Sequence, residues 1–215
     1  MIQNLIKTTN TKEFYQDCNL KLESYNFKTS DNTLEFIFSI NQSSYDKIVE
    51  YQEWKITCIK TKSFNRFFND NLLPNVKMEL LDKHPLLLIH QENQLHCEIT
   101  GKPKNINEFI GEMSNELEQL TGNWITFSQY FWNCTERFEK NLQRTIAIPE
   151  SLKNPIKSIC EKHGLSFKIK EEDKAYSYKS DAKLLIFGNK DISPNDFNFF
   201  QPYVIAENFI AERIK

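Results

Sequence analysis

The stretch LKLESYNFKTSDNTLEFIFSI, residues 20–40, contains the pattern that decides the fold. Apolar side chains recur at alternate positions on both sides of the polar cluster Ser30-Asp31-Asn32, with one irregularity before Tyr25. Such alternation is typical of a half-buried β-strand, and clustered Ser, Asp and Asn residues favour a turn. The stretch therefore predicts a β-hairpin.

The period-two pattern continues beyond this hairpin. Trp54, Ile56 and Cys58 predict a third strand, and residues 76–81 predict another. We interpret residues 64–74 as irregular or briefly helical. Together these segments indicate that the N-terminal part of the chain is an antiparallel meander.

A second hairpin is predicted in LLLIHQENQLHCEIT, residues 86–100, with its turn centred on Asn93. This register places His90 across from His96 and Glu98 diagonal to His90, on the second face of the hairpin. A shift by one residue would mix apolar and charged side chains on a single face. The preferred register instead collects one apolar face, made of Leu87, Ile89, Leu95, Cys97 and Ile99.

Residues 105–122 predict an amphipathic helix. Asn105 with Glu108 has the form of a capping box, and Gly122 suits a left-handed stop. Apolar side chains recur between them at helical spacing. The aromatic segment NWITFSQYFW, residues 123–132, is expected to fold back onto the sheet.

Residues 134–149 shift to a charged and mixed composition, and we interpret them as the join between two units. Beyond them, Asn154-Pro155 and His163-Gly164 are start and stop signals of a helix. Strands are predicted at 165–170 and 175–189, whereas residues 201–215 fit a strand and a helix equally well. The predicted class is α+β, with a sheet-plus-helix domain in 1–135 and a smaller α-β-β unit in 146–215, which could also pack as one domain.

The composition indicates a globular cytoplasmic protein. The chain has 215 residues, a formal net charge of -2 and no run of about 18 apolar residues, which argues against a membrane helix and against general attraction to nucleic acid. The start MIQNLIKTTNTK is too polar for a signal peptide. Five cysteines without CxxC spacing favour reduced core thiols, with neither a structural zinc site nor a disulfide framework.

One candidate metal site follows from the second hairpin. A transition metal needs several ligands at about 2.0–2.2 Å from one point, and His90, His96 and Glu98 on one strand face could supply two nitrogens and a carboxylate. The alternative interpretation is an exposed polar pair on a short hairpin. Adjacent strand residues point to opposite faces, so His96 is not expected to activate Cys97.

The other two histidines are interpreted as structural. Asp82 and His84 precede Pro85 in a predicted turn, where a local hydrogen bond or a cap is the expected role of the imidazole. His163 precedes the helix-ending Gly164, where the helix dipole favours a cation.

An acidic and aromatic stretch lies between Lys104 and Arg137, where the sequence has no lysine or arginine. Like charges at i, i+4 spacing on a helix are destabilising by a few tenths of a kcal/mol per pair, so a helix selected only for stability would usually carry compensating lysines. Tryptophan and tyrosine follow directly, and both are enriched at interface anchors. The predicted partner-binding residues are Glu108, Glu112, Glu116, Glu118, Trp124, Tyr130 and Trp132.

These features lead to three function hypotheses. The first is a non-enzymatic binding protein without cofactor, whose acidic helix engages a basic protein; its narrower form is an inhibitor that covers the partner's active site, such as an immunity protein against a toxin. The second is a small metal-dependent hydrolase that uses the His-His-Glu set. The third is a structural or oligomeric subunit, for example a homodimer. Nine lysines between Lys153 and Lys190 give the second half the opposite charge balance, which could steer a partner or a second copy.

Overall fold

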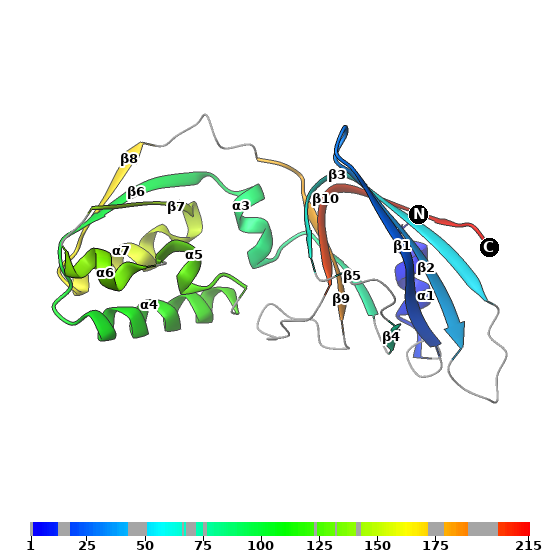
Figure 1. Cartoon of the computed structure of the whole chain (residues 1–215), viewed down its shortest axis with the longest axis horizontal. Coiled ribbons are helices and arrows are strands. Elements are labelled where there is room, and N and C mark those ends of the chain that lie inside the picture. Colours follow the sequence, from blue (N-terminus) through cyan, green and yellow to red (C-terminus); the bar gives the residue numbers. More distant parts are fainter. Residues whose placement is uncertain are drawn as a thin grey trace. The chain divides into compact units, whose positions relative to one another are not determined.

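The chain folds as mixed helices and antiparallel sheets, which confirms the α+β class. The computed structural model describes residues 2–12, 18–42, 51–65, 67, 72–74, 77–122, 124–131, 133–140, 143–171, 179–188 and 202–215. The chain divides into two compact units. Within the described residues, unit 1 comprises the chain up to Lys83 together with two later strands, and unit 2 comprises His84–Asp181 (Figure 1).

Unit 1 is a seven-stranded antiparallel sheet in the order β4-β1-β2-β3-β10-β9-β5, with one helix. Leu20 pairs with Ile40 and Phe27 with Leu34, so the predicted first hairpin is confirmed. The register shifts between Leu22 and Ser24, at the irregularity expected before Tyr25. The elements are α1 (Ile2–Thr9), β1 (Cys18–Lys28), β2 (Thr33–Gln42), β3 (Gln52–Asn65), β4 (Leu72–Pro74), β5 (Lys77–Leu81), β9 (Lys183–Gly188) and β10 (Tyr203–Arg213).

The large sheet curls around its own core. Strands β2 and β9 are three positions apart in the sheet, which corresponds to about 14 Å in a flat sheet. The rings of Phe38 and Phe187 on these two strands nevertheless stack with their centroids 5.4 Å apart. A register shift in the β3–β10 pair, opposite Ile205 and Ala206, increases the local twist. Helix α1 packs against this sheet (Figure 1), and its Ile2 and Leu5 belong to the same core.

Unit 2 is a three-stranded sheet with helices packed on one side of it (Figure 1). The strand order is β7-β6-β8, and both outer strands are antiparallel to β6, so β7 and β8 are parallel and α7 connects them as a split β-α-β motif. None of the described helices combines the length and apolar character needed to cross a bilayer. The elements are η1 (Pro85–Leu87), α3 (Leu88–Gln91), β6 (Gln94–Thr100), α4 (Ile106–Thr121), α5 (Phe127–Phe131), α6 (Cys134–Glu139), β7 (Arg144–Pro149), η2 (Glu150–Leu152), α7 (Lys153–Lys162) and β8 (Ser166–Glu171).

The predicted second hairpin is wrong in its first half. Residues 85–91 form the short helices η1 and α3, while only Gln94–Thr100 is a strand. Pro85 occupies a first-turn position, where its fixed φ favours helix, and Leu is a strong helix former. Ile89, expected on the apolar face, is 52% exposed. Strand β6 pairs instead with β7 and β8, although its inward face of Leu95, Cys97 and Ile99 is as predicted.

The two units also differ from the division expected near residues 135–146. Residues 144–149 are strand β7 inside unit 2, paired with β6. The strands predicted at 165–170 and 175–189 correspond to β8 and β9, but they belong to different sheets, and the polar turn expected between them falls largely outside the described residues. Residues 203–213 are the strand β10. Unit 2 is therefore inserted in the sequence of unit 1, between β5 and β9.

Candidate functional site

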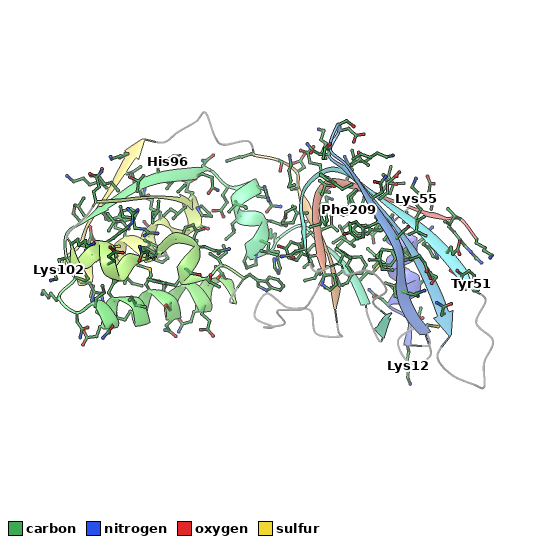
Figure 2. The ribbon with its side chains drawn as sticks, viewed as in Figure 1. Lys12, Tyr51, Lys55, His96, Lys102 and Phe209 are labelled. Carbon is green, nitrogen blue, oxygen red and sulfur yellow. The ribbon has the colours of Figure 1, made fainter. Side chains whose placement is uncertain are left out.

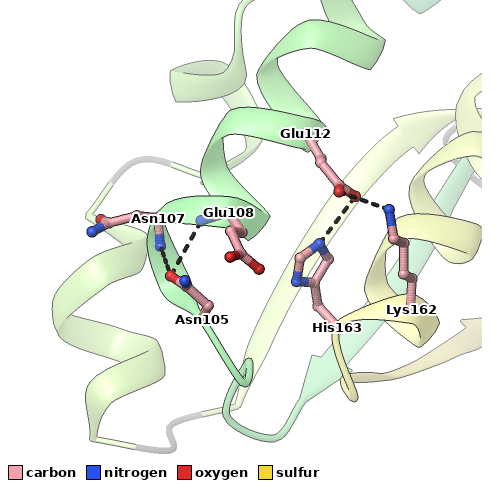
Figure 3. A network of polar contacts seen from close by, with 6 residues as sticks. All are labelled: Asn105, Asn107, Glu108, Glu112, Lys162 and His163. Atoms are coloured by element: carbon pink, nitrogen blue, oxygen red, sulfur yellow. Dashed lines mark hydrogen bonds and ion pairs between the residues drawn. The ribbon is translucent and has the colours of Figure 1, made fainter.

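Helix α4 is the most acidic element of unit 2, and its two ends are closed by the residues predicted from the sequence. The Asn105 side-chain oxygen accepts hydrogen bonds from the backbone N–H groups of Asn107 at 3.1 Å and Glu108 at 3.3 Å (Figure 3). At the other end Gly122 adopts a left-handed φ of 56°, which favours glycine. The caps define both ends of the 16-residue helix, so the side of the helix on which each side chain lies follows from its position.

The inner face of α4 is buried in the core of unit 2 through Phe109, Met113, Leu117 and Thr121. Glu108, Glu112, Glu116 and Leu120 follow i, i+4 spacing and so form one ridge along the helix. Leu120 is 46% exposed and ends this ridge with an apolar side chain. Glu118 lies about 160° from Glu116 around the helix axis, so it belongs to the opposite flank.

Glu112 connects α4 to α7. One carboxylate oxygen lies 2.7 Å from the Lys162 Nζ, and the other lies 3.1 Å from Nε2 of the buried His163 (Figure 3). The hydrogen bond from Lys162, and after it the one from His163, lowers the pKa of the Glu112 carboxyl. Because this carboxylate already has two intramolecular partners, we assign it to the packing of the two helices.

The other three glutamates of α4 have no basic partner in the part of the chain that the structure describes. Among the described residues, no ion pair reaches Glu108, Glu116 or Glu118. Glu108 and Glu118 are exposed, and Glu116 is half-buried. Their negative charge is therefore left for solvent or for another molecule.

The predicted aromatic anchors are only partly accessible. Trp124 is half-buried, and its ring lies edge-on to His84 with the centroids 4.9 Å apart. Tyr130 packs against the core of unit 2, and burial raises the pKa of its phenol to about 12. The backbone carbonyl of Tyr130 accepts a hydrogen bond from Arg144 Nε at 2.8 Å. Trp132 lies outside the described residues.

The His-His-Glu metal site is not formed. His90 lies in helix α3, whereas His96 is opposite Ala147 on β7, so the predicted cross-strand pair does not exist. Glu98 accepts a hydrogen bond from Gln143 and pairs with Lys170. In the part of the chain that the structure describes, no three His, Cys, Asp or Glu side chains are placed to hold a metal ion. The predicted metal site depended on a hairpin between residues 86–91 and 94–100, and residues 85–91 are helical instead.

The thiols are core residues rather than nucleophiles. Cys18, Cys58, Cys97 and Cys160 are buried and form no disulfide with one another. Burial raises the pKa of Cys97 to about 11 and that of Cys160 to about 12, which disfavours the reactive thiolate. Cys97 and His96 point to opposite faces of β6, as expected.

A cavity of about 330 Å³ beside the first turn of α4 was not anticipated from the sequence. Its lining consists of Lys102, Pro103, Lys104, Asn105, Ile106 and Phe138. The only local signal is the pair of lysines around a proline immediately before the helix cap. Phe138 comes from α6, and nothing in the sequence pattern places it beside residues 102–106.

No protein-family model, curated protein or solved structure matches the chain. The proposals below therefore rest on the geometry and chemistry of its own residues.

Proposed function

We propose that the protein binds a basic protein partner through the outward side of α4. The observation that supports this proposal is the set of three glutamates, Glu108, Glu116 and Glu118, which have no cationic partner among the described residues. Exposed charges on a helix are usually compensated at i, i+4 spacing, and α4 has no lysine or arginine to do so. A surface of one sign attracts a partner of the opposite sign and accelerates the encounter.

The size of the surface limits what α4 can do alone. A 16-residue helix is about 24 Å long and presents a strip about 10 Å wide, or roughly 240 Å². A stable protein interface buries about 800 Å² per partner. Neighbouring segments must therefore contribute. Leu120, which is 46% exposed, is an apolar side chain near one end of the strip, and the half-buried Trp124 follows four residues later. This arrangement suits a non-catalytic binding protein, and the narrower form of the proposal is an inhibitor that covers the basic partner's active site.

A defined basic probe tests the surface before any natural partner is identified. We would titrate a fluorescent lysine- and arginine-rich peptide with the full chain and measure anisotropy at low and at physiological salt. The triple variant E108Q/E116Q/E118Q is expected to weaken binding about tenfold and to reduce its salt dependence. The control E150Q/E161Q/E212Q removes three exposed carboxylates elsewhere and is expected to bind as the wild type does.

Both triple variants remove three negative charges, so comparing them separates an effect of α4 from an effect of net charge. Equal weakening in both triple variants would mean that net charge, not α4, attracts the probe, and the proposal would fail. If the α4 triple alone loses binding, the same pair of variants can be used to identify the natural partner. That partner is then the basic protein that copurifies in near-equal amount with the wild type and the control triple, but not with the α4 triple.

A further inference from the structure

The cavity beside α4 has a fixed wall. Gly101, with a φ of 108°, turns the chain out of β6, and a Cβ there would lie 3.5 Å from the carbonyl oxygen of Gly164. The backbone N–H of Lys104 donates to the carbonyl of His163 at 3.3 Å. Asn105 then caps α4. Hydrogen bonds therefore anchor the segment at Lys104 and Asn105, beside the cavity.

The lining combines cations with an apolar wall. Lys102 and Lys104 are exposed, and no carboxylate in the described residues pairs with either ammonium group; Lys102 extends outward at the edge of unit 2 (Figure 2). Pro103 and Phe138 are buried, and Ile106 is half-buried. Among the side chains that the structure describes, no aspartate or glutamate lines the cavity. Unpaired cations next to apolar side chains complement an anionic group attached to an apolar body.

The helix end itself contributes little to this chemistry. The Asn105 side-chain oxygen already takes the N–H groups of Asn107 and Glu108, and the Glu108 carboxylate stands in the same first turn. The two lysines and the apolar wall are therefore the features that would select a ligand. Glu108 would oppose an anion, because like charges repel.

We propose that this cavity binds a small phosphate monoester with an aromatic or apolar body. A phosphate monoester carries about -1.5 to -2 charges at neutral pH, which two lysine ammonium groups can balance. The volume of about 330 Å³ falls within the range of small-molecule sites, roughly 300–1,000 Å³, and admits one ring with its phosphate. This site is separate from the outward side of α4 and takes a ligand of the opposite charge from the proposed protein partner.

Phenyl phosphate is the probe, and ¹H–¹⁵N correlation spectra of the full chain measure where and how tightly it binds. We expect saturable shifts of the amides of residues 102 and 104–106 and of Phe138, with inorganic phosphate binding more weakly because it lacks the ring. The variant K102Q/K104Q is expected to weaken binding about tenfold or more. The control K168Q/K179Q changes two exposed lysines of unit 2 that are outside the cavity and is expected to bind normally.

Several outcomes would overturn the proposal: no saturable binding at millimolar phenyl phosphate, shifts centred on other residues, equal loss in both lysine variants, or inorganic phosphate binding as tightly as the ester. Glu108→Gln separates this site from the protein-binding surface. It should tighten phenyl phosphate binding about twofold, because a nearby negative charge is removed. The same change removes one of the three carboxylates proposed to bind the basic partner, so it should weaken binding of the basic peptide.

Discussion

His84 is a buried imidazole that serves as a helix cap. It is 5% exposed, and its Nδ1 accepts a hydrogen bond from the backbone N–H of Leu86 at 3.2 Å. The neutral ring must therefore carry its proton on Nε2, and protonation of Nδ1 would remove the acceptor. Burial lowers the pKa of His84 to about 4. The local cap expected from the sequence is confirmed, because a histidine directly before Pro85 has the first turn of η1 within reach.

His84 makes the stability of unit 2 depend on pH. Its folded pKa lies below the unfolded value of about 6.5, so its contribution is complete above pH 6.5 and is lost as the pH falls toward 4. The free energy of unfolding should decrease by up to about 1.4 kcal/mol per pH unit in that window. His84→Asn keeps a capping acceptor and cannot be protonated there, so urea unfolding at pH 7 and pH 5 should show a smaller decrease in the variant. An equal decrease in both proteins would contradict this assignment.

At the scale of elements, the contact between α4 and α7 depends on one carboxylate. Glu112→Gln should lower the urea midpoint of unfolding at pH 7, because it removes the carboxylate charge that pairs with Lys162 and contacts the His163 ring. The pKa of Glu112 is lowered in the folded protein, so this contribution is present above the ordinary carboxyl range and is lost on acidification. Glu116→Gln, one turn further on the same ridge and without an ion pair in the described residues, should leave the midpoint nearly unchanged. If the two variants have the same urea midpoint, the contact of Glu112 with Lys162 and His163 does not stabilise the fold.

The N-cap of α4 supports a second prediction at this scale. Asn105→Ala should lower the free energy of unfolding by about 1 kcal/mol, because two backbone N–H groups lose their acceptor. Asn105→Asp should retain most of the stability. Asn115→Ala, at an exposed position in the middle of the same helix, should instead be neutral or slightly stabilising, because alanine has the higher helix propensity. Denaturant titrations of the three variants measure the difference, and equal losses at positions 105 and 115 would exclude a capping role.

Elements with local signals could be predicted from the sequence, and elements defined by distant partners could not. The β1–β2 hairpin has its turn within the same stretch, and α4 has its cap and stop within 18 residues. The partner of strand β6 is β7, about 50 residues later in the sequence. Local periodicity instead favoured residues 86–91 as its hairpin partner, and the predicted His90–His96 pair was wrong for that reason. The glutamates of α4 could be located, but the neutralisation of Glu112 by α7 could not, since it depends on how two helices pack.

For the whole molecule, the insertion of unit 2 makes the two units unequal. In the described residues unit 2 is one segment, 84–181, with its own core, whereas unit 1 needs strands from both sides of that segment. We expect residues 84–181 alone to fold, and residues 1–83 alone to remain unfolded, because β3 and β5 would lack β10 and β9. Dispersed amide spectra and a cooperative thermal transition for the 84–181 fragment would agree with this expectation. A collapsed, non-cooperative fragment would contradict it.

The boundary between the two units could not be predicted from the sequence either, because it depends on pairing between distant strands. Residues 134–149 look like a linker by composition, yet they supply the edge strand β7, and the chain passes between units at Lys83–His84 and Asp181–Ala182 without a marked change in composition. Which strands share the large sheet is decided by β3–β10 and β5–β9 pairing across more than 100 residues, and single-sequence periodicity contains no information about it.

The central place of β10 in the large sheet has a consequence for biosynthesis. Strand β3 leaves the ribosome well before its partner β10, since 138 positions separate Asn65 from Tyr203. At roughly 5–20 residues per second, translation leaves this edge open for about 7–28 seconds. An open edge that carries Trp54, Ile56 and Cys58 is a template for wrong pairing with other nascent chains. Unit 2 can complete its own core during that interval, so the hazard during synthesis is concentrated in the first three strands of the chain, which are the best candidates for protection by a chaperone.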